Sequence, residues 1–165
     1  MNALTPIAQS IATLLIGRKE TVAVAESSAG GLISAALLSV PGASAYFLGG
    51  GVIYTQAARR GLLQVSDDAV KGIRSSTEAY AQVKARTIRE RLGATWGLSE
   101  TGAAGPTGNR YGDAAGHACF AVAGPLERAI TLETAHGDRE TNMQAFAKAA
   151  LEFFEAALRS PGARS

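Results

Sequence analysis

The chain has 165 residues, of which 47% are apolar and 18% are charged, and its formal net charge is +2. This composition predicts one globular domain with a single core and excludes an intrinsically disordered chain. No run of basic residues is longer than the pair Arg59 and Arg60, so the chain lacks the basic stripe of a general nucleic-acid binder. No stretch reaches the roughly 20 apolar residues that span a bilayer. We therefore expect neither a nucleic-acid partner nor a membrane partner.

One cysteine, Cys119, has no partner for an internal disulfide, and with two histidines it supplies too few ligands for a common zinc site. The sequence thus predicts a protein without a structural metal and without a cofactor. The segment Ile7 to Ile16 is apolar, but polar residues interrupt it and no basic leader precedes it. This pattern does not indicate a signal peptide, and we expect a cytoplasmic location.

Helical and strand patterns alternate along the first two thirds of the chain, with glycine or proline at most boundaries. The spacing predicts helices over about 5–16, 32–40, 57–63 and 77–92, and strands over about 21–25, 49–54 and 95–99. Two further strands, 117–123 and 128–134, are joined by Gly124 and Pro125, and a last helix covers about 141–158. These elements predict an α/β fold, a three-layer α/β/α sandwich with a mixed sheet, as one domain over 1–165 with its core at about 5–159. We expect the residues from about Ser160 to fray.

The helix predicted over 77–92 is amphipathic. Its charged residues are interpreted as its solvated face: Lys84, Arg86, Arg89, Glu90 and Arg91.

Two loops that leave buried strands are the places where a ligand is expected, because ligands of open α/β sheets gather at the carboxyl ends of strands. The first, Glu26 to Gly31, presents the hydroxyls of Ser27 and Ser28 and the glycines Gly30 and Gly31 at a helix start. Free backbone N–H groups there can hold an anion or a developing oxyanion. The alternative is that one serine merely caps the helix.

The second loop, Thr101 to Gly108, contains Gly102, Gly105, one proline and two threonines. Exposed amides in such a loop can cradle a phosphate without a charged side chain. The Gly-Lys-Ser/Thr ending of nucleoside triphosphatases is absent. The alternative is a rigid connection without a ligand. We expect both loops to emerge at the same edge of the sheet.

Four ordered blocks carry a resemblance that covers about Ile7 to Leu158. They read Ala-Glu-Ser-Ser-Ala-Gly-Gly from position 25, Pro-Gly-Ala-Ser-Ala-Tyr-Phe from 41, Thr-Gly-Ala-Ala-Gly-Pro from 101 and Gly-Asp-Arg from 137. This series resembles the CinA C-terminal domain family. The resemblance implies an amidohydrolase of the kind that includes nicotinamide mononucleotide deamidase, which converts the amide to the acid and releases ammonia. A small phosphorylated nucleotide is then the expected partner.

Larger CinA proteins also carry an N-terminal nucleotide pyrophosphatase domain, for which 165 residues leave no room, so we expect no such activity. Family members are commonly homo-oligomers. The apolar segment Tyr46-Phe47-Leu48 can be interpreted as an interface between copies or as part of the core.

In the first block the resemblance implies that Ser27 is the nucleophile, with Gly30, Gly31 and nearby amides stabilising the oxyanion. Ser28 stands where the family usually has cysteine, and Ala29 where it usually has threonine. The loss of that threonine removes one hydrogen-bonding group from the neighbourhood of the site.

Another segment, Tyr54-Thr55-Gln56-Ala57-Ala58-Arg59, resembles a family block that reads Tyr-Ser-Asn-Glu-Ala-Lys. The family's lysine is the natural general base for the serine. Arg59 replaces it, and a guanidinium stays protonated, although it can bind a phosphate or carboxylate bidentately. Tyr54 is interpreted as orienting the nucleophile or substrate, with a core tyrosine as the alternative.

Glu100 stands where an apolar residue commonly precedes the Thr-Gly block. It is interpreted as a replacement proton acceptor, as a partner of Arg59, or as an exposed carboxylate at a strand end. Arg139 matches the arginine of the last block and is the candidate for contacting a substrate phosphate or ribose, the alternative being an ion pair near a helix start. His117 and His136 are interpreted as structural.

Three functions remain open from the sequence. The first is deamidation of nicotinamide mononucleotide. The second is an inactive or repurposed nucleotide-binding module, and the third is hydrolysis of a different phosphorylated or carboxylated amide.

Overall fold

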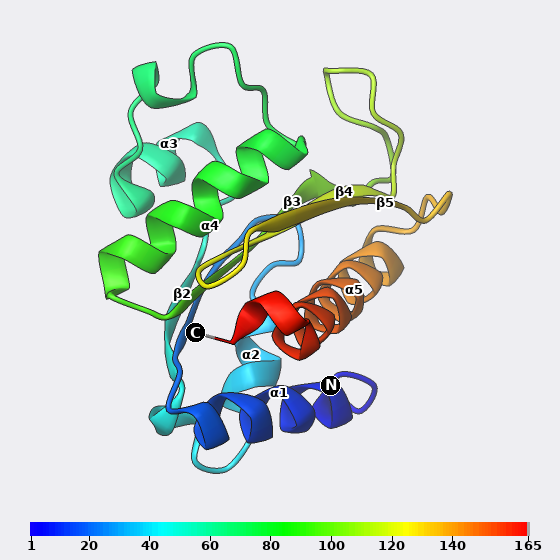
Figure 1. Ribbon diagram of the computed structural model, residues 1–165. Helices are drawn as coiled ribbons and strands as arrows, with labels where there is room; N and C mark the ends of the chain where they lie inside the picture. The colour runs from blue at the N-terminus through cyan, green and yellow to red at the C-terminus, as the bar shows by residue number, and fades with distance from the viewer. Residues whose placement is uncertain (165) are drawn as a thin grey trace.

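The computed structural model describes residues 1–164 and is built around a five-stranded sheet in the order β2-β1-β3-β4-β5 (Figure 1). β1 lies parallel to β2 and β3, whereas β4 is antiparallel to both of its neighbours. The strands are β1 (Val22–Glu26), β2 (Phe47–Val52), β3 (Trp96–Ala103), β4 (His117–Ala123) and β5 (Arg128–Glu133). The prediction of a mixed sheet is confirmed.

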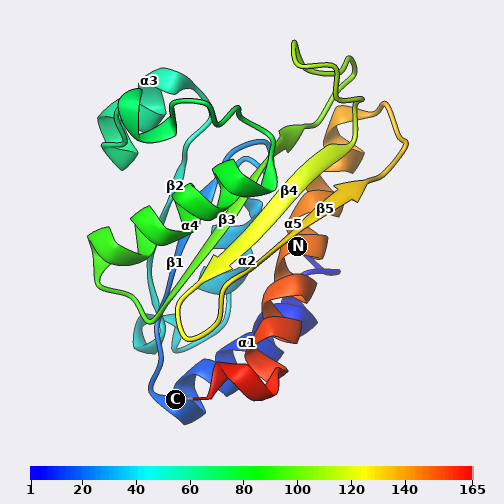
Figure 2. The ribbon, with the colours of Figure 1, turned by 45° about the horizontal axis from the view of Figure 1, so that its top comes forward.

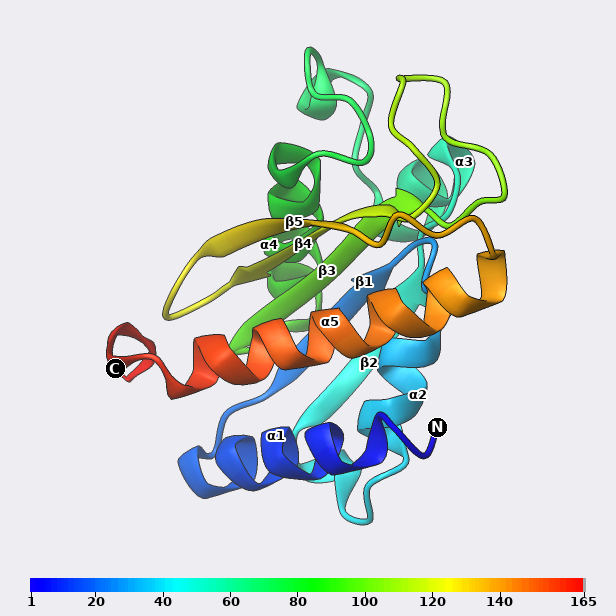
Figure 3. The same ribbon diagram turned by 90° about the vertical axis from the view of Figure 1, so that its right-hand side faces the viewer.

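Helices cover both faces of the sheet, which confirms the predicted three layers. α1, α2 and α5 lie on one face, with α1 and α5 side by side in Figure 3. α4 covers the other face, beside the short α3 and a π-helical turn at Arg59–Leu63 (Figure 2). The helices are α1 (Thr5–Arg18), α2 (Leu32–Leu38), α3 (Gln56–Ala58), α4 (Glu78–Leu92) and α5 (Arg139–Arg159). The helix predicted over 57–63 is therefore divided between α3 and the π-helical turn.

The alternation of side chains along the strands divides the core into two parts. Val22 and Val24 of β1 face α1, α2 and α5, where large residues dominate. There the Trp96 ring meets the edge of Phe154 with ring centroids 5.8 Å apart. The residues that β1 and the neighbouring strands turn toward α4 are mostly small, so that helix lies close to the sheet.

The chain ends differ from the prediction. α5 begins two residues before the predicted start, because the Asp138 carboxylate accepts a hydrogen bond from the Thr141 amide at 2.8 Å and caps the helix. The prediction of fraying from Ser160 is wrong for the described residues. Pro161–Ala163 form a 3₁₀ turn, and Ala163 is buried, as is Leu4 at the other end. The core thus extends slightly beyond 5–159.

The Tyr46-Phe47-Leu48 segment is divided between core and surface. Tyr46 is fully buried and donates a hydrogen bond to the Leu37 carbonyl, whereas Leu48 is 43% exposed.

Gly97 allows α4 to approach β3. A Cβ at Gly97 would lie 1.9 Å from the Ala85 carbonyl oxygen, so Gly97→Ala has to displace the helix. We expect this substitution to lower the free energy of unfolding by about 1–3 kcal/mol or more. Gly17→Ala in α1 is the control, because a Cβ there meets nothing within 4 Å, and it should raise that free energy by roughly 0.5–1 kcal/mol. Urea unfolding measures both, and a Gly97→Ala variant as stable as the parent would contradict this packing.

Candidate active site

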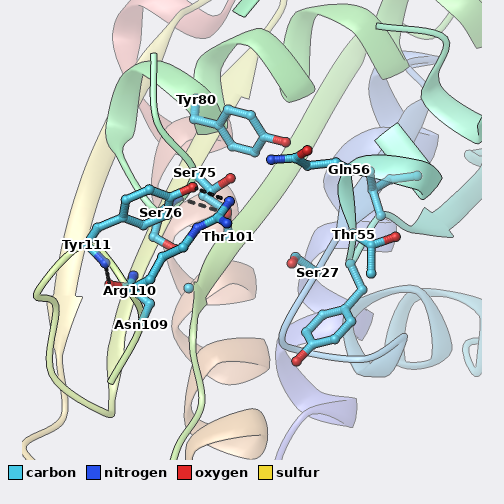
Figure 4. Close-up of a pocket in the computed structure, with 13 residues that line it drawn as sticks. Ser27, Thr55, Gln56, Ser75, Ser76, Tyr80, Thr101, Asn109, Arg110 and Tyr111 are labelled. Atoms are coloured by element: carbon cyan, nitrogen blue, oxygen red, sulfur yellow. Dashed lines mark hydrogen bonds between the residues drawn. The ribbon is translucent and has the colours of Figure 1, made fainter. Parts of the chain in front are cut away.

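The loops that follow β1 and β3 emerge at the same end of the sheet, because the two strands are parallel with Ala25 opposite Ser99. Ser27 from the first loop and Thr101 and Gly102 from β3 line one cavity of about 270 Å³ (Figure 4). The expectation that both loops meet at one sheet edge is confirmed. We call this cavity the Ser27 half of the cleft.

A second cavity of about 260 Å³ shares Tyr54, Gly102 and Asn109 with the first. Its other walls are the glycine-rich loop after β3 and the side chain of Arg139. We call it the Arg139 half. The two halves adjoin each other at these shared residues, and together they make a cleft at the carboxyl ends of β1 and β3, where ligands of α/β sheets bind.

The Glu100 carboxylate fixes the Ser27 loop by hydrogen bonds. Its fully buried carboxylate accepts hydrogen bonds from the amides of Ser27 and Ala29, both at 2.9 Å, and from the hydroxyl of Ser28. The interpretation of Glu100 as an exposed carboxylate is therefore wrong. These three contacts also speak against Glu100 as the proton acceptor, because both of its oxygens already receive hydrogen bonds.

Glu26 performs a similar task at the start of α2. Its carboxylate accepts hydrogen bonds from the amides of Gly31, Ile33 and Ser34 at 2.8–3.1 Å. Burial raises the pKa of Glu26 above its ordinary value, and the hydrogen bonds around Ser34 oppose that rise. The Gly31 amide is therefore occupied, and the Gly30 amide donates to the Ser27 carbonyl at 3.1 Å. Neither amide is available for the oxyanion role that the family resemblance implied.

Lys84 lies between the two loops on the α4 side of the sheet. Its Nζ donates to the backbone carbonyls of Glu100 at 2.8 Å and Glu26 at 3.4 Å, and the residue is 1% exposed. These carbonyls belong to the residues directly before Thr101 and Ser27. The assignment of Lys84 to the solvated face of its helix was wrong. Spacing could have indicated its burial, since Tyr80, Lys84 and Ile88 recur every fourth position along one face.

Arg59 does not line either half of the cleft. Its buried guanidinium pairs with Asp67 and donates to the carbonyls of Ser66 at 2.7 Å and Val65 at 3.3 Å. The predicted pairing of Arg59 with Glu100 is not formed. Arg59 instead fixes the chain that follows the π-helical turn. Its position outside the cleft removes it from the candidates for binding substrate.

Tyr54 and Arg139 meet across the mouth of the Arg139 half. The Arg139 guanidinium donates to the Tyr54 hydroxyl at 3.1 Å and to the Gly105 carbonyl at 2.6 Å. Tyr54 is 57% exposed, so it is not a core residue. The alternative reading of Arg139, an ion pair at a helix start, is not realised, because Arg139 makes no carboxylate contact within residues 1–164.

No site residue was predicted from the sequence on the wall that faces Ser27. It comes from the segment before α4, from the first turn of α4 and from the loop between β3 and β4 (Figure 4). The residues concerned are Ser75, Ser76, Tyr80, Asn109, Arg110 and Tyr111. Their positions depend on tertiary contacts between segments that are distant in the chain, so no local pattern marks them.

The buried imidazole of His117 contacts Glu133 and the Ser76 carbonyl, consistent with a structural role. In the part of the chain that the structure covers, no group of three or more His, Cys, Asp or Glu side chains is placed to hold a metal ion. Nor does any helix there have the length and apolar content needed to cross a membrane.

The fold and the cleft define an α/β/α domain with its candidate site at the ends of two parallel strands. Residues 4–158 match the family model of the CinA C-terminal domain, and the chain belongs to this family. CinA-like proteins from Chlorobaculum tepidum and Salinibacter ruber are each 40% identical, over 146 and 138 residues. The matches cover 86% and 84% of this chain and 34% of each relative. The chain thus spans about one third of the length of these relatives.

Solved structures of the same superfamily share the fold. A competence-damaged protein (CinA) superfamily protein from Klebsiella pneumoniae superposes with a TM-score of 0.87 at 26% identity, covering 94% of this chain and 97% of that one. The competence/damage inducible protein from Agrobacterium tumefaciens gives 0.85 at 27% identity and covers 96% of each chain.

The buried amine of Lys84 predicts a stability that depends on pH. Burial lowers its pKa from 10.5 to about 8, and the Glu100 and Glu26 charges only partly oppose this shift. The unfolded chain therefore binds more protons than the folded one between about pH 8 and 10.5, and the free energy of unfolding rises with pH in that window. Relative to Lys84→Met, the parent protein should gain about 2 kcal/mol between pH 7 and 9.5.

Urea unfolding of both proteins at the two pH values measures this difference. Lys148→Met is the matched control, because the Lys148 side chain is 53% exposed, and its stability should follow that of the parent. Equal pH dependences for the parent and Lys84→Met would contradict the prediction.

Proposed function

We propose that the chain is a serine amidohydrolase of the nicotinamide mononucleotide deamidase kind, with Ser27 as its nucleophile. The observation that carries this proposal is the contrast between adjacent serines. The Ser28 hydroxyl is bound to Glu100, whereas the Ser27 hydroxyl lines the cleft and has no hydrogen-bond partner within residues 1–164. Buried contacts fix the loop backbone around Ser27, so the residue is held at the cavity while its hydroxyl remains free to react.

In the proposed reaction the Ser27 oxygen bonds to the amide carbon and the carbon–nitrogen bond breaks. The serine proton leaves with the nitrogen as ammonia, and water then splits the acyl-serine to the free acid. The Thr101 hydroxyl oxygen accepts a hydrogen bond from the Ser76 amide at 3.3 Å, which leaves its hydrogen available to donate. We assign this hydrogen to the developing oxyanion in place of Gly30 and Gly31.

The Arg139 half is assigned to the substrate phosphate. Its lining combines a glycine-rich loop with one guanidinium and contains no Asp or Glu. Two of the five N–H donors of Arg139 are used on Gly105 and Tyr54, and the others remain for a ligand. A guanidinium beside a loop rich in backbone amides is suited to a phosphate group.

Removal of the nucleophile tests the reaction. With nicotinamide mononucleotide as the probe, Ser27→Ala should lower the rate of ammonia release by on the order of 10³-fold or more, while binding persists. Ser39→Ala is the control, because its hydroxyl donates to the Ala36 carbonyl at the end of α2 and does not line the cleft. Turnover retained by Ser27→Ala would exclude Ser27. Binding without ammonia release by the parent protein would instead favour a nucleotide-binding module.

Removal of the Arg139 guanidinium tests the phosphate assignment. Arg139→Met should raise the dissociation constant of nicotinic acid mononucleotide at least about tenfold, since charge-assisted hydrogen bonds contribute about 1.5–3 kcal/mol. Tyr54→Phe removes the hydroxyl that accepts a hydrogen bond from Arg139 but keeps the guanidinium, and its effect should be smaller. Isothermal titration calorimetry measures both, and an unchanged dissociation constant in Arg139→Met would refute the assignment.

A further inference from the structure

Arg110 brings a second guanidinium into the cleft. It stands in the loop between β3 and β4, and Figure 4 shows its side chain reaching over the Ser27 half toward Thr101, on the wall that faces Ser27. Its guanidinium carbon lies 5.1 Å from the centre of the Tyr111 ring, and one of its N–H groups donates to the Tyr111 hydroxyl at 3.0 Å. The ring thus supports the guanidinium at the edge of the cavity.

The loop that carries Arg110 is itself held in a defined shape. The Asn109 side-chain oxygen accepts hydrogen bonds from the amides of Tyr111 at 3.0 Å and Asp113 at 3.1 Å, and its nitrogen donates to the Asp113 carboxylate at 2.7 Å. Arg74 binds the same carboxylate with two donors, at 2.6 and 3.1 Å. These contacts tie the loop to the segment before α4.

The protein does not neutralise the Arg110 charge. Arg74 is paired with Asp113, but Arg110 has no carboxylate partner within residues 1–164. No Asp or Glu lines the Ser27 half. The same cavity also presents hydroxyl groups, among them those of Ser27, Thr55, Ser75, Tyr80, Thr101 and Tyr111. A cavity that combines one cation with hydroxyl donors is complementary to an oxyanion.

We propose that the Ser27 half is a carboxylate-binding subsite anchored by Arg110. The ligand that this half favours then carries a phosphate at Arg139 and, beside Ser27 and Arg110, the carboxylate that amide hydrolysis produces. This inference rests on the proposed function, because that function places the reacting carbonyl at Ser27.

Nicotinamide mononucleotide carries an uncharged carboxamide on its ribosylated ring. Nicotinic acid mononucleotide has the same ring and phosphate, but it carries a carboxylate where the first compound has the amide. The two compounds therefore separate the effect of Arg110 from that of Arg139.

Calorimetric titration of both compounds tests the subsite without requiring turnover. The parent protein should bind nicotinic acid mononucleotide at least about tenfold more tightly than nicotinamide mononucleotide. Arg110→Met should bring this ratio close to one, and Arg110→Lys, which keeps the charge, should retain part of it. Arg139→Met should weaken both compounds and leave the ratio in place. Arg128→Met removes the same charge from β5 outside the cleft and should behave as the parent.

The proposal is overturned if the parent shows no preference, if the preference survives in Arg110→Met, or if neither compound binds. Thermal unfolding of each variant verifies that it is folded. Ammonia release from nicotinamide mononucleotide is measured in parallel for the parent protein and for each variant. A preference that depends on Arg110 without ammonia release would overturn the amidohydrolase reaction on this compound and support the subsite. Ammonia release without that preference would overturn the subsite alone.

Discussion

Two buried carboxylates occupy the place where the start of α2 would otherwise bind a ligand anion. Glu26 takes the first amides of the helix, and Glu100 takes those of Ser27 and Ala29. The Lys84 amine lies against the carbonyls of both glutamates and supplies the positive charge. Loss of either carboxylate leaves buried amides without an acceptor, which costs about 1–3 kcal/mol for each unsatisfied group. The shape of the nucleophile loop is thus set by the protein itself.

The fold was predictable because the hydrophobic spacing and the order of helices and strands along the chain both indicate it. Hydrophobic spacing identified the main helices and strands, and parallel strands necessarily bring the loops after them to one edge. The placement of Ser27 beside Thr101 followed from that rule. The position of Lys84 was missed because it was grouped with the charges around it, although its spacing matches the buried residues of α4.

The partners of the other candidate residues could not be predicted, because tertiary structure brings them together. The pairing of Arg59 with Asp67 depends on the π-helical turn that begins at Arg59, and no local pattern indicated this turn. Glu100 finds its donors on a loop more than 70 residues earlier in the chain. The wall that faces Ser27 is likewise formed by segments that are distant in the chain. Relatives with the same fold at about 26% identity show that such a scaffold can be kept while the residues on it change.

The pairing of Arg74 with Asp113 has a consequence for ligand binding in the cleft. It joins the segment before α4 to the loop after β3, and both of these line the Ser27 half. The pair holds the two segments together, so the side chains on them have a defined mutual arrangement. A ligand that enters has little left to order on this side, so less conformational entropy is lost on binding. The selectivity of the pocket is in this sense prepared before any substrate arrives.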